Sequence, residues 1–239
     1  MEIEGKRVLV SGAGRGLGRA LVAMFAEAGA REVVAGTRKP EAREELAVLP
    51  NVTPVQLDVT NDADVAAVAQ IGAIDILINN AGFAGFGNPL VMSFADIEKE
   101  MSVNYLGVLR LTRAIVPGMI AQGDGMIVNI ATAFAKINLP LVGTYWARKA
   151  ALYSVGQAMR AHLAGTGVRV ITVLPTTIDT DMSSGADVPK MTKEFVAEEI
   201  LNAIRSEAHD PPIGDEAKSI LDEFAKDPVG LEMMLMKYK

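Results

Sequence analysis

The chain has 239 residues, and 50% of them are hydrophobic, so it can bury a large core. Its 23 basic and 29 acidic residues give a formal net charge of −6, which leaves no basic footprint for nucleic acid or an anionic membrane surface. The absence of cysteine excludes disulfides, thiolate metal sites and a cysteine nucleophile.

Location and metal content are predicted from the same kind of evidence. No apolar stretch reaches the ~20 residues that a membrane-spanning helix needs, and the opening residues MEIEGKR do not form a signal peptide. We therefore expect a cytoplasmic protein that binds neither membrane nor nucleic acid. The two histidines, His162 and His209, lie far apart in the sequence, so no metal site is expected.

Short apolar runs alternate with helical segments along the whole chain. The runs expected to be strands are residues 7–11, 32–36, 53–57, 74–79, 125–130 and 168–174. This alternation predicts an α/β fold, a Rossmann-like doubly wound parallel β-sheet flanked by helices. No repeat or break in composition divides the chain, so residues 1–239 are expected to form a single dinucleotide-binding domain.

The first strand leads into a glycine-rich turn and an amphipathic helix in KRVLVSGAGRGLGRALVAMFAEAGA. Gly12 permits a tight turn, Gly16 lets the backbone approach a pyrophosphate, and Gly18 allows close packing. The following helix points its N–H groups at the anion. No register of these glycines, Gly14 included, gives G-x-G-x-x-G, and the turn is not a P-loop. An ordinary strand-to-helix connection is the alternative interpretation.

A second motif lies in TYWARKAALYSVGQAMRAHL, where Tyr145 and Lys149 are spaced i and i+4 and therefore share one helix face. A positive charge near a phenol favours the phenolate and lowers its pKa from about 10, which suits the pair to proton transfer. The same spacing also arises by chance, as a surface lysine beside a half-buried tyrosine.

These motifs resemble the short-chain dehydrogenase/reductase family, whose members carry Thr-Gly-x-x-x-Gly-x-Gly at the glycine turn, with Ser11 in place of the threonine here. Further segments fit the family in order along nearly the whole chain. They are Asn79-Asn80-Ala81-Gly82 after IDILI, Asn104 in MSVNYLG, Thr132 after MIVNI, and Pro175 ending VRVITVL. The 13 residues that separate Thr132 from Tyr145 match the family's serine-to-tyrosine spacing.

The resemblance implies catalytic roles for four residues. Tyr145 would donate a proton as hydride reaches the substrate carbonyl, and Lys149 would lower the tyrosine pKa and bind the nicotinamide ribose. Asn104 would hold a water of the proton relay, although alone it is equally a polar residue that bends a helix. Thr132 would donate to the substrate oxygen where the family usually has serine, or be only a strand-end threonine.

The end of the second strand, Ala35-Gly36-Thr37-Arg38, indicates the cofactor, because ligands meet the carboxyl ends of strands. NAD-preferring members present an aspartate there, whereas a neutral residue followed by arginine suits a 2′-phosphate. NADP(H) is therefore predicted over NAD(H), with Arg15 as a second positive charge. Glu32 begins that strand and would point away. A solvated loop arginine is the alternative interpretation of Arg38.

The resemblance extends the cofactor site over further segments. Asp58 would accept from the adenine amino group, Val59 would offer a backbone N–H, and Ile178 and Thr180 would bind the carboxamide, Thr180 alternatively the pyrophosphate. Asn80 would line the ribose, or cap the strand in a turn. The complete predicted set is Gly12, Gly14, Arg15, Gly16, Leu17, Gly18, Thr37, Arg38, Asp58, Val59, Asn80, Ala81, Gly82, Tyr145, Lys149, Pro175, Ile178 and Thr180.

By family position, an apolar and partly aromatic set of residues would form the substrate pocket, although core packing explains several of them equally well. These are Phe83, Phe86, Phe134, Ile137, Leu139, Val142 and Met182. They predict a small hydrophobic carbonyl or alcohol substrate. Residues 181–193 are expected to form a short mobile lid.

The C-terminal stretch HDPPIGDEAKSILDEFAKDPVGLEMMLMKYK predicts a short strand, a helix and a tail in place of the family's common glycine-rich ending. The helices expected at roughly 95–122 and 145–165 are the family's usual pairing surface, so a homodimer or homotetramer is expected.

Two other functions stay open. A catalytically silent NADP(H)-binding sensor or structural protein of the same fold would be favoured if Tyr145 or Lys149 were missing, and both are present. A dehalogenating relative would carry arginine in place of the lysine, but Arg148 lies one position early.

Overall fold

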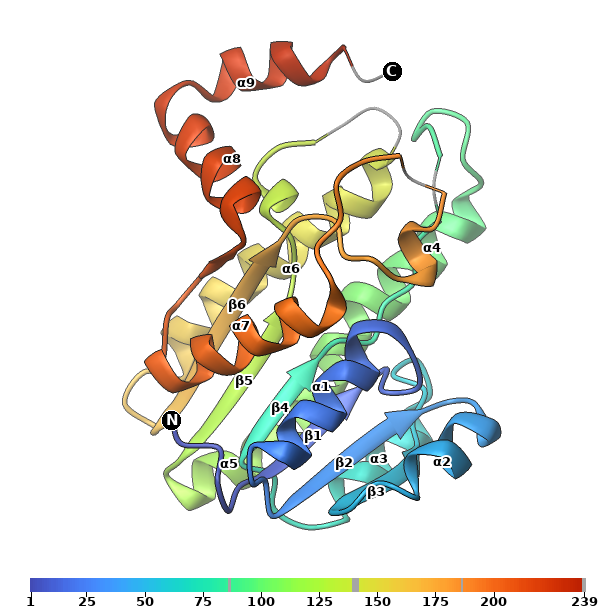
Figure 1. Ribbon diagram of the computed structural model, residues 1–239, viewed down its shortest axis with the longest axis vertical. Helices are drawn as coiled ribbons and strands as arrows, with labels where there is room; N and C mark the ends of the chain where they lie inside the picture. The colour runs from blue at the N-terminus through green and yellow to red at the C-terminus, as the bar shows by residue number, and fades with distance from the viewer. Residues whose placement is uncertain (86, 139–141, 186, 238–239) are drawn as a thin grey trace.

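The computed structural model describes residues 1–85, 87–138, 142–185 and 187–237. Within these ranges the strands form one parallel sheet in the order β3-β2-β1-β4-β5-β6-β7 (Figure 1). The strands are β1 (Arg7–Ser11), β2 (Glu32–Thr37), β3 (Val52–Gln56), β4 (Ile76–Asn79), β5 (Gly125–Ile130), β6 (Val168–Pro175) and β7 (Pro212–Ile213). The order reverses at β1, which pairs with β2 on one side and β4 on the other. The predicted Rossmann-like doubly wound sheet is confirmed, and a ligand crevice is expected at this reversal.

Helices cover both faces of the sheet (Figure 1). They are α1 (Gly16–Glu27), α2 (Pro40–Leu46), α3 (Asp62–Ala69), α4 (Phe94–Met101), the π-helix η1 (Ser102–Leu106), α5 (Gly107–Gln122), the 3-10 helix η2 (Ala133–Ala135), α6 (Gly143–His162), the 3-10 helix η4 (Asp181–Ser183), α7 (Lys193–Ser206), α8 (Asp215–Lys226) and α9 (Pro228–Leu235).

The core lies in two layers, one on each face of the sheet. Successive side chains of a strand point to opposite faces, so Val8 and Val10 of β1 join one layer and Leu9 joins the other. The first layer also contains buried residues of α1 and α7, and the second contains buried residues of α3 and α5. Burial on both faces explains why the strands read as continuous apolar runs in the sequence.

The helix expected at 95–122 is interrupted. It consists of α4, η1 and α5 in succession, and the wider π-helical turn contains Asn104. Short π-helical segments inside α-helices occur frequently at functional sites. The helix expected at 145–165 is present as α6.

The sequence predicted a tail after the C-terminal helix, and this prediction is wrong for residues 228–235, which form α9. The Asp227 side chain accepts from the N–H of Gly230 and caps this helix. Leu231 and Leu235 then bury their side chains against Ile137, which stabilises the short helix through packing. Helices α8 and α9 lie together at the C-terminal end of the chain (Figure 1).

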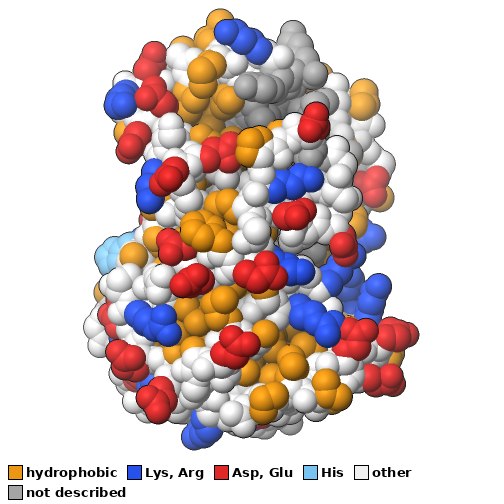
Figure 2. Space-filling model, viewed as in Figure 1, with side chains coloured by type: hydrophobic (Ala, Val, Ile, Leu, Met, Phe, Trp, Pro, Cys, Tyr) orange, Lys and Arg blue, Asp and Glu red, His pale blue; other side chains and the backbone are white. Residues whose placement is uncertain are grey.

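Acidic and basic side chains are interspersed over the face of the molecule seen in Figure 2. Across the described ranges, every helix is too short or too polar to cross a membrane. The same residues hold no cluster of His, Cys, Asp and Glu that could bind a metal ion.

Candidate active site

The glycine turn between β1 and α1 is shaped by contacts that a side chain would destroy. Gly12 has φ +69°, and a Cβ there would lie 2.8 Å from the Cα of Ala81. A Cβ at Gly18 would lie 2.2 Å from the carbonyl oxygen of Gly12. Glycine is therefore required at both positions, because the helix and the segment after β4 come this close to the turn. Both glycines were singled out from the sequence.

Ser11 and Asn80 join the turn to the segment that follows β4. The Oγ of Ser11 donates to the carbonyl of Ile78 and accepts from the N–H groups of Asn80 and Ala81, each at 3.1 Å. The side-chain amide of Asn80 donates to the carbonyls of Ser11 and Gly12. The role that this structure shows for Asn80 is therefore to hold the glycine turn in shape.

A crevice of about 450 Å³ opens beside the turn. It is lined by Gly14, Arg15, Gly16, Arg19, Asp179, Thr180, Asp181, Ser184 and Lys193. Helix α1 begins here, and its N-cap residue Arg15 makes no side-chain capping bond. Its three basic side chains outnumber its two aspartates, and together with the positive end of the helix they suit an anion such as a pyrophosphate. The charge of the crevice thus fits the phosphate part of a dinucleotide.

Thr180 and Asp181 close the crevice on the side opposite the turn. The methyl group of Thr180 lies 3.3 Å from the position that a Cβ of Gly16 would take. Asp181 pairs with Arg15 at 3.1 Å, although both side chains are exposed. The structure therefore brings Thr180, Arg15 and Gly16 together, as the sequence predicted for one cofactor site.

The residues predicted to read the adenosine end of the cofactor also meet. Arg38 follows β2, its side chain is exposed, and its Nη1 lies 3.7 Å from Oδ2 of Asp58. Arg43 donates to the carbonyl oxygens of Thr37 and Arg38, and so fixes the backbone of this corner. Thr37 is buried with its hydroxyl against Gly14. An exposed guanidinium beside a neutral residue offers a charged donor to a phosphate.

Asp58 is held as a carboxylate. Burial raises its pKa, but hydrogen bonds from Thr60 and the charge of Arg38 outweigh burial and leave the pKa below its ordinary value. Its backbone N–H donates to Asp64 at 2.8 Å. Val59 next to it packs its side chain in the core, so only its backbone is available to a ligand.

Tyr145 and Lys149 lie on α6 as predicted, with the Lys149 Nζ 6.0 Å from the centre of the Tyr145 ring. Nζ donates to the carbonyl of Ile130 at 2.6 Å. Burial, and then the charge of Arg148, lowers the Lys149 pKa to about 7. Lys149 thus lies at the carboxyl end of β5, at the same edge of the sheet as the glycine turn.

The Tyr145 phenol does not have the lowered pKa that the sequence predicted. Burial raises the pKa of the phenol above its ordinary value, Arg148 opposes this, and Glu100 adds to it. Arg148 is also the nearer cation, with Cζ 3.9 Å from the ring centre. A phenol with a raised pKa stays protonated at neutral pH, as a proton donor must.

Thr132 follows β5, and its hydroxyl is engaged with the protein. Oγ1 donates to the carbonyl of Pro175 at 2.9 Å and accepts from the N–H of Phe134. This links the carboxyl ends of β5 and β6, and the side chain is 5% exposed. To donate to a substrate oxygen, the hydroxyl must leave Pro175.

Asn104 fixes the loop after β4. Its Oδ1 accepts from the N–H of Phe83, and its Nδ2 donates to the carbonyls of Phe83 and Glu100. The side chain is 1% exposed. These contacts give Asn104 a structural role that the sequence alone did not indicate.

The described members of the predicted pocket are found in several places. Phe134 stacks on Trp146 with ring centres 4.3 Å apart, and it packs with Ile137 against Leu231 and Leu235 of α9. Met182 lies near Gly82. Val142 is half-buried at the start of α6, and Lys99 lies over the Phe83 ring. Phe86 and Leu139 lie outside the described residues.

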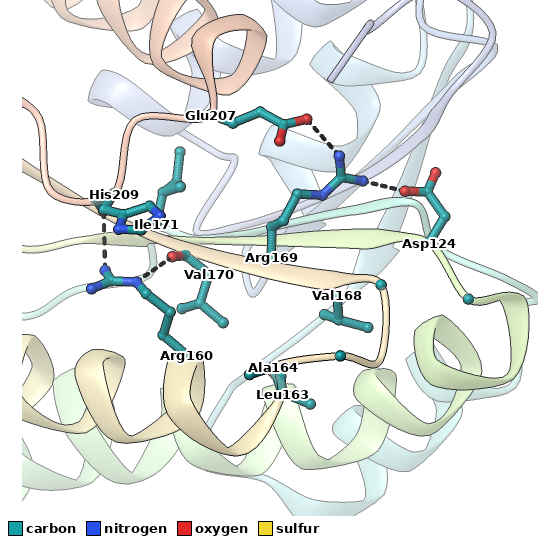
Figure 3. A pocket seen from close by; sticks show the side chains of 13 residues that line it. Asp124, Arg160, Leu163, Ala164, Val168, Arg169, Val170, Ile171, Glu207 and His209 are labelled. Atoms are coloured by element: carbon teal, nitrogen blue, oxygen red, sulfur yellow. Dashed lines mark hydrogen bonds and ion pairs between the residues drawn. The ribbon is translucent and has the colours of Figure 1, made fainter.

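A second cavity, of about 540 Å³, lies at the amino ends of β5 and β6 (Figure 3). Arg169 pairs there with Asp124 and Glu207, and Arg160 donates to backbone carbonyls of Val170 and His209. Its charged groups are thus matched within the protein. None of the described residues that line it was predicted for the site.

Comparisons with known proteins agree with this geometry. A family model described as short chain dehydrogenase matches residues 6–189. The "Dehydrogenase/reductase SDR family protein 7-like" of Anopheles gambiae is 34% identical over 239 residues, which covers 94% of this chain and 74% of that protein. The "D-erythrulose reductase" of Gallus gallus is 33% identical over 184 residues, with 76% and 75% covered. A short chain dehydrogenase from Burkholderia cenocepacia, solved in complex with NADP, has a TM-score of 0.93 and 38% identity, and covers 98% of this chain and 99% of that one.

Proposed function

Because the chain belongs to the short-chain dehydrogenase family of oxidoreductases, we propose that it is an NADP(H)-dependent carbonyl reductase. It would transfer hydride between the nicotinamide and the carbonyl or alcohol group of a small hydrophobic substrate, in the direction of ketone or aldehyde reduction. The observation that carries this proposal is the position of Tyr145 and Lys149 on one face of α6, beside the end of β5.

The residues of the crevice fit a dinucleotide. Gly12 and Gly18 let the turn pack closely against the segment after β4 and the start of α1, and the N-terminus of α1, which has no side-chain cap, faces the crevice. Bound NADPH would supply the hydride. Arg38 would contact the 2′-phosphate, because its guanidinium is exposed and the neighbouring Thr37 carries no charge that would repel the phosphate. The NADP complex of the Burkholderia cenocepacia relative supports the same choice of cofactor.

The catalytic residues would divide the work between proton transfer and binding. Tyr145 would donate the proton to the developing alkoxide, since its phenol stays protonated at neutral pH. Lys149 would exchange the Ile130 carbonyl for a ribose hydroxyl, and Thr132 would turn from Pro175 to the substrate oxygen. Asn104 would keep the loop after β4 in place for both ligands, and would hold a relay water if one enters.

A hydrophobic substrate is favoured by the apolar side chains near the end of β5 and the start of α6. Phe134 stacks on Trp146, the residue that follows Tyr145, and Met182 lies near Gly82. Residues 181–193, which include η4, would act as the lid. We also propose that two or four copies associate through the outer faces of α5 and α6, which size-exclusion chromatography with light scattering would test.

The proposed function is tested by following NADPH oxidation with a panel of aromatic and aliphatic ketones and aldehydes, with sugar ketones as the polar comparison. Each substrate is also tested with NADH at the same concentration. The proposal predicts turnover of the apolar carbonyls and a higher kcat/KM for NADPH. Turnover with NADH alone would contradict the choice of cofactor, and exclusive use of polar sugars would contradict the substrate class.

A further inference from the structure

A charged pair is buried beside Tyr145. The Arg148 Nη1 lies 2.8 Å from Oε2 of Glu100, and the side chains are 0% and 1% exposed. Arg148 belongs to α6 and Glu100 to α4. Taking two charges out of water is costly, and a well-packed apolar pair is often at least as stable. Stability alone therefore does not account for the pair.

The pair also holds the loop that follows β4. Arg148 Nη2 donates to the carbonyl of Phe83, and Glu100 Oε1 accepts from the N–H of Gly85 at 2.6 Å. Asn104 also binds both backbone polar groups of Phe83. Two helices and the loop are thus joined through one ion pair, and the loop begins at the segment that shapes the glycine turn.

The guanidinium of Arg148 lies over the Tyr145 ring, with its Cζ 3.9 Å from the ring centre. A cation at this distance is attracted to the ring face and restricts how the ring can turn. Lys149 is farther away, and its ammonium is bound to Ile130. Within the described residues, Nε and Nη1 of Arg148 make no hydrogen bond, so the ion pair with Glu100, the Nη2 bond to Phe83 and the ring contact account for its position.

We propose that Arg148 is a positioning residue for the reaction, held by Glu100, which orients the Tyr145 ring and places a positive charge closer to the ring centre than Lys149 does. This inference rests on the proposed role of Tyr145. Among the described residues, Arg148 and Lys149 from α6 and Glu100 from α4 are charged groups that act on Tyr145. Arg148 lowers the pKa of the phenol and Glu100 raises it, so the pair sets the pH at which the phenol ionises.

The test neutralises the pair while it preserves shape. In Glu100→Gln/Arg148→Met, glutamine still accepts from Gly85 and methionine fills the volume of the arginine stem, so no buried charge is left alone. The matched control is Arg7→Met/Glu32→Gln, which removes a partly buried ion pair at the amino ends of β1 and β2. Arg148→Lys keeps the charge but loses the planar contact.

Two readouts separate positioning from folding. Fluorotyrosine is incorporated and the ionisation of residue 145 is followed by fluorine NMR, with Tyr145→Phe identifying the signal. A positive charge within ~4–6 Å lowers the pKa of a phenol by about 1–3 units, and the negative charge of Glu100 offsets part of the effect of Arg148. Loss of both charges in Glu100→Gln/Arg148→Met should therefore raise the ionisation midpoint of Tyr145 by about one pH unit. Misplacement of the ring should lower kcat by about 10- to 100-fold while the NADPH Kd changes little.

Arg148→Lys should keep the wild-type ionisation midpoint and lose part of kcat, and Arg7→Met/Glu32→Gln should change neither. A folded Glu100→Gln/Arg148→Met protein with the wild-type midpoint and kcat would overturn the proposal. If that protein does not fold, Arg148→Lys decides, because it keeps a positive charge opposite Glu100: the fluorine signal of residue 145 must shift as the ring loses the guanidinium contact, and an unchanged signal overturns the proposal. The NMR titration needs no turnover, so a wild type that reduces no carbonyl refutes the proposed function without affecting this result.

Discussion

Lys149 gives the stability of the protein a pH dependence that can be worked out from the structure. Its side chain is 6% exposed, and burial, then Arg148, lowers its pKa to about 7. An unfolded chain restores a pKa of ~10.4. Between these two values the unfolded state binds a proton that the folded state lacks, so stability rises with pH. The penalty for a protonated Lys149 is complete below about pH 7 and disappears as the pH approaches 10.4.

Lys149→Met removes this titration and keeps most of the packing volume. From the two pKa values, wild type gains roughly 2–3 kcal/mol of unfolding free energy relative to the variant between about pH 6 and pH 9. Urea unfolding of both proteins without nucleotide, at several pH values in this range, measures the difference. The control is Lys226→Met, because the Lys226 side chain is 69% exposed.

The difference between wild type and Lys149→Met should therefore move in favour of wild type as the pH rises, whereas Lys226→Met should follow wild type at a constant offset. Parallel curves for wild type and Lys149→Met would refute the reasoning, since they would mean that the folded lysine keeps an ordinary pKa despite its burial.

Three further changes test other parts of the site. Arg38→Ala should weaken NADPH binding by roughly 10–150-fold in a fluorescence titration and leave NADH binding almost unchanged, because one charge-assisted hydrogen bond contributes ~1.5–3 kcal/mol. Equal losses of affinity for the two nucleotides would mean that Arg38 only supports the loop. Thr132→Val should reduce activity and lower the unfolding free energy by ~1–3 kcal/mol, since the buried carbonyl of Pro175 loses its donor. Thr132→Ser keeps the hydroxyl and should be tolerated. A valine variant with wild-type activity and stability would show that the hydroxyl has no role. Gly18→Ala should lower the unfolding free energy by ~1–3 kcal/mol or more and abolish NADPH binding, because its Cβ would lie 2.2 Å from a backbone oxygen. The control Gly118→Ala, whose Cβ would meet nothing within 4 Å, should leave thermal stability unchanged or raise it. Similar thermal stabilities of the two variants would contradict the close approach at the turn.

Features carried by one continuous segment, or by neighbouring strand ends, were predictable from the sequence. The glycine turn is local, and its positions follow from the need for close backbone approach. Arg38 and Asp58 meet because β2 and β3 run parallel in register, with Thr37 opposite Gln56, so residues just beyond the two strands share one edge. Tyr145 and Lys149 share a face through helical spacing alone.

Orientation and long-range pairing were not predictable. The sequence gives no sign that the Lys149 ammonium binds the Ile130 carbonyl, or that the Thr132 hydroxyl binds Pro175, because both depend on how β5, β6 and α6 pack. The pair of Glu100 and Arg148 joins residues far apart in the chain. A weak signal existed, since Arg148 is one turn from Tyr145 and Glu100 is one turn from Asn104.

The central claim is that Tyr145 donates the proton in an NADPH-dependent reduction, and Tyr145→Phe tests it most directly. The variant keeps the ring against Arg148 and removes only the hydroxyl. Steady-state turnover on the best carbonyl of the panel, measured beside the NADPH Kd, should show kcat reduced by ~10²–10⁴-fold with cofactor binding nearly intact. A variant that keeps more than about a tenth of the wild-type kcat would contradict the claim, because a lost general acid costs far more than that.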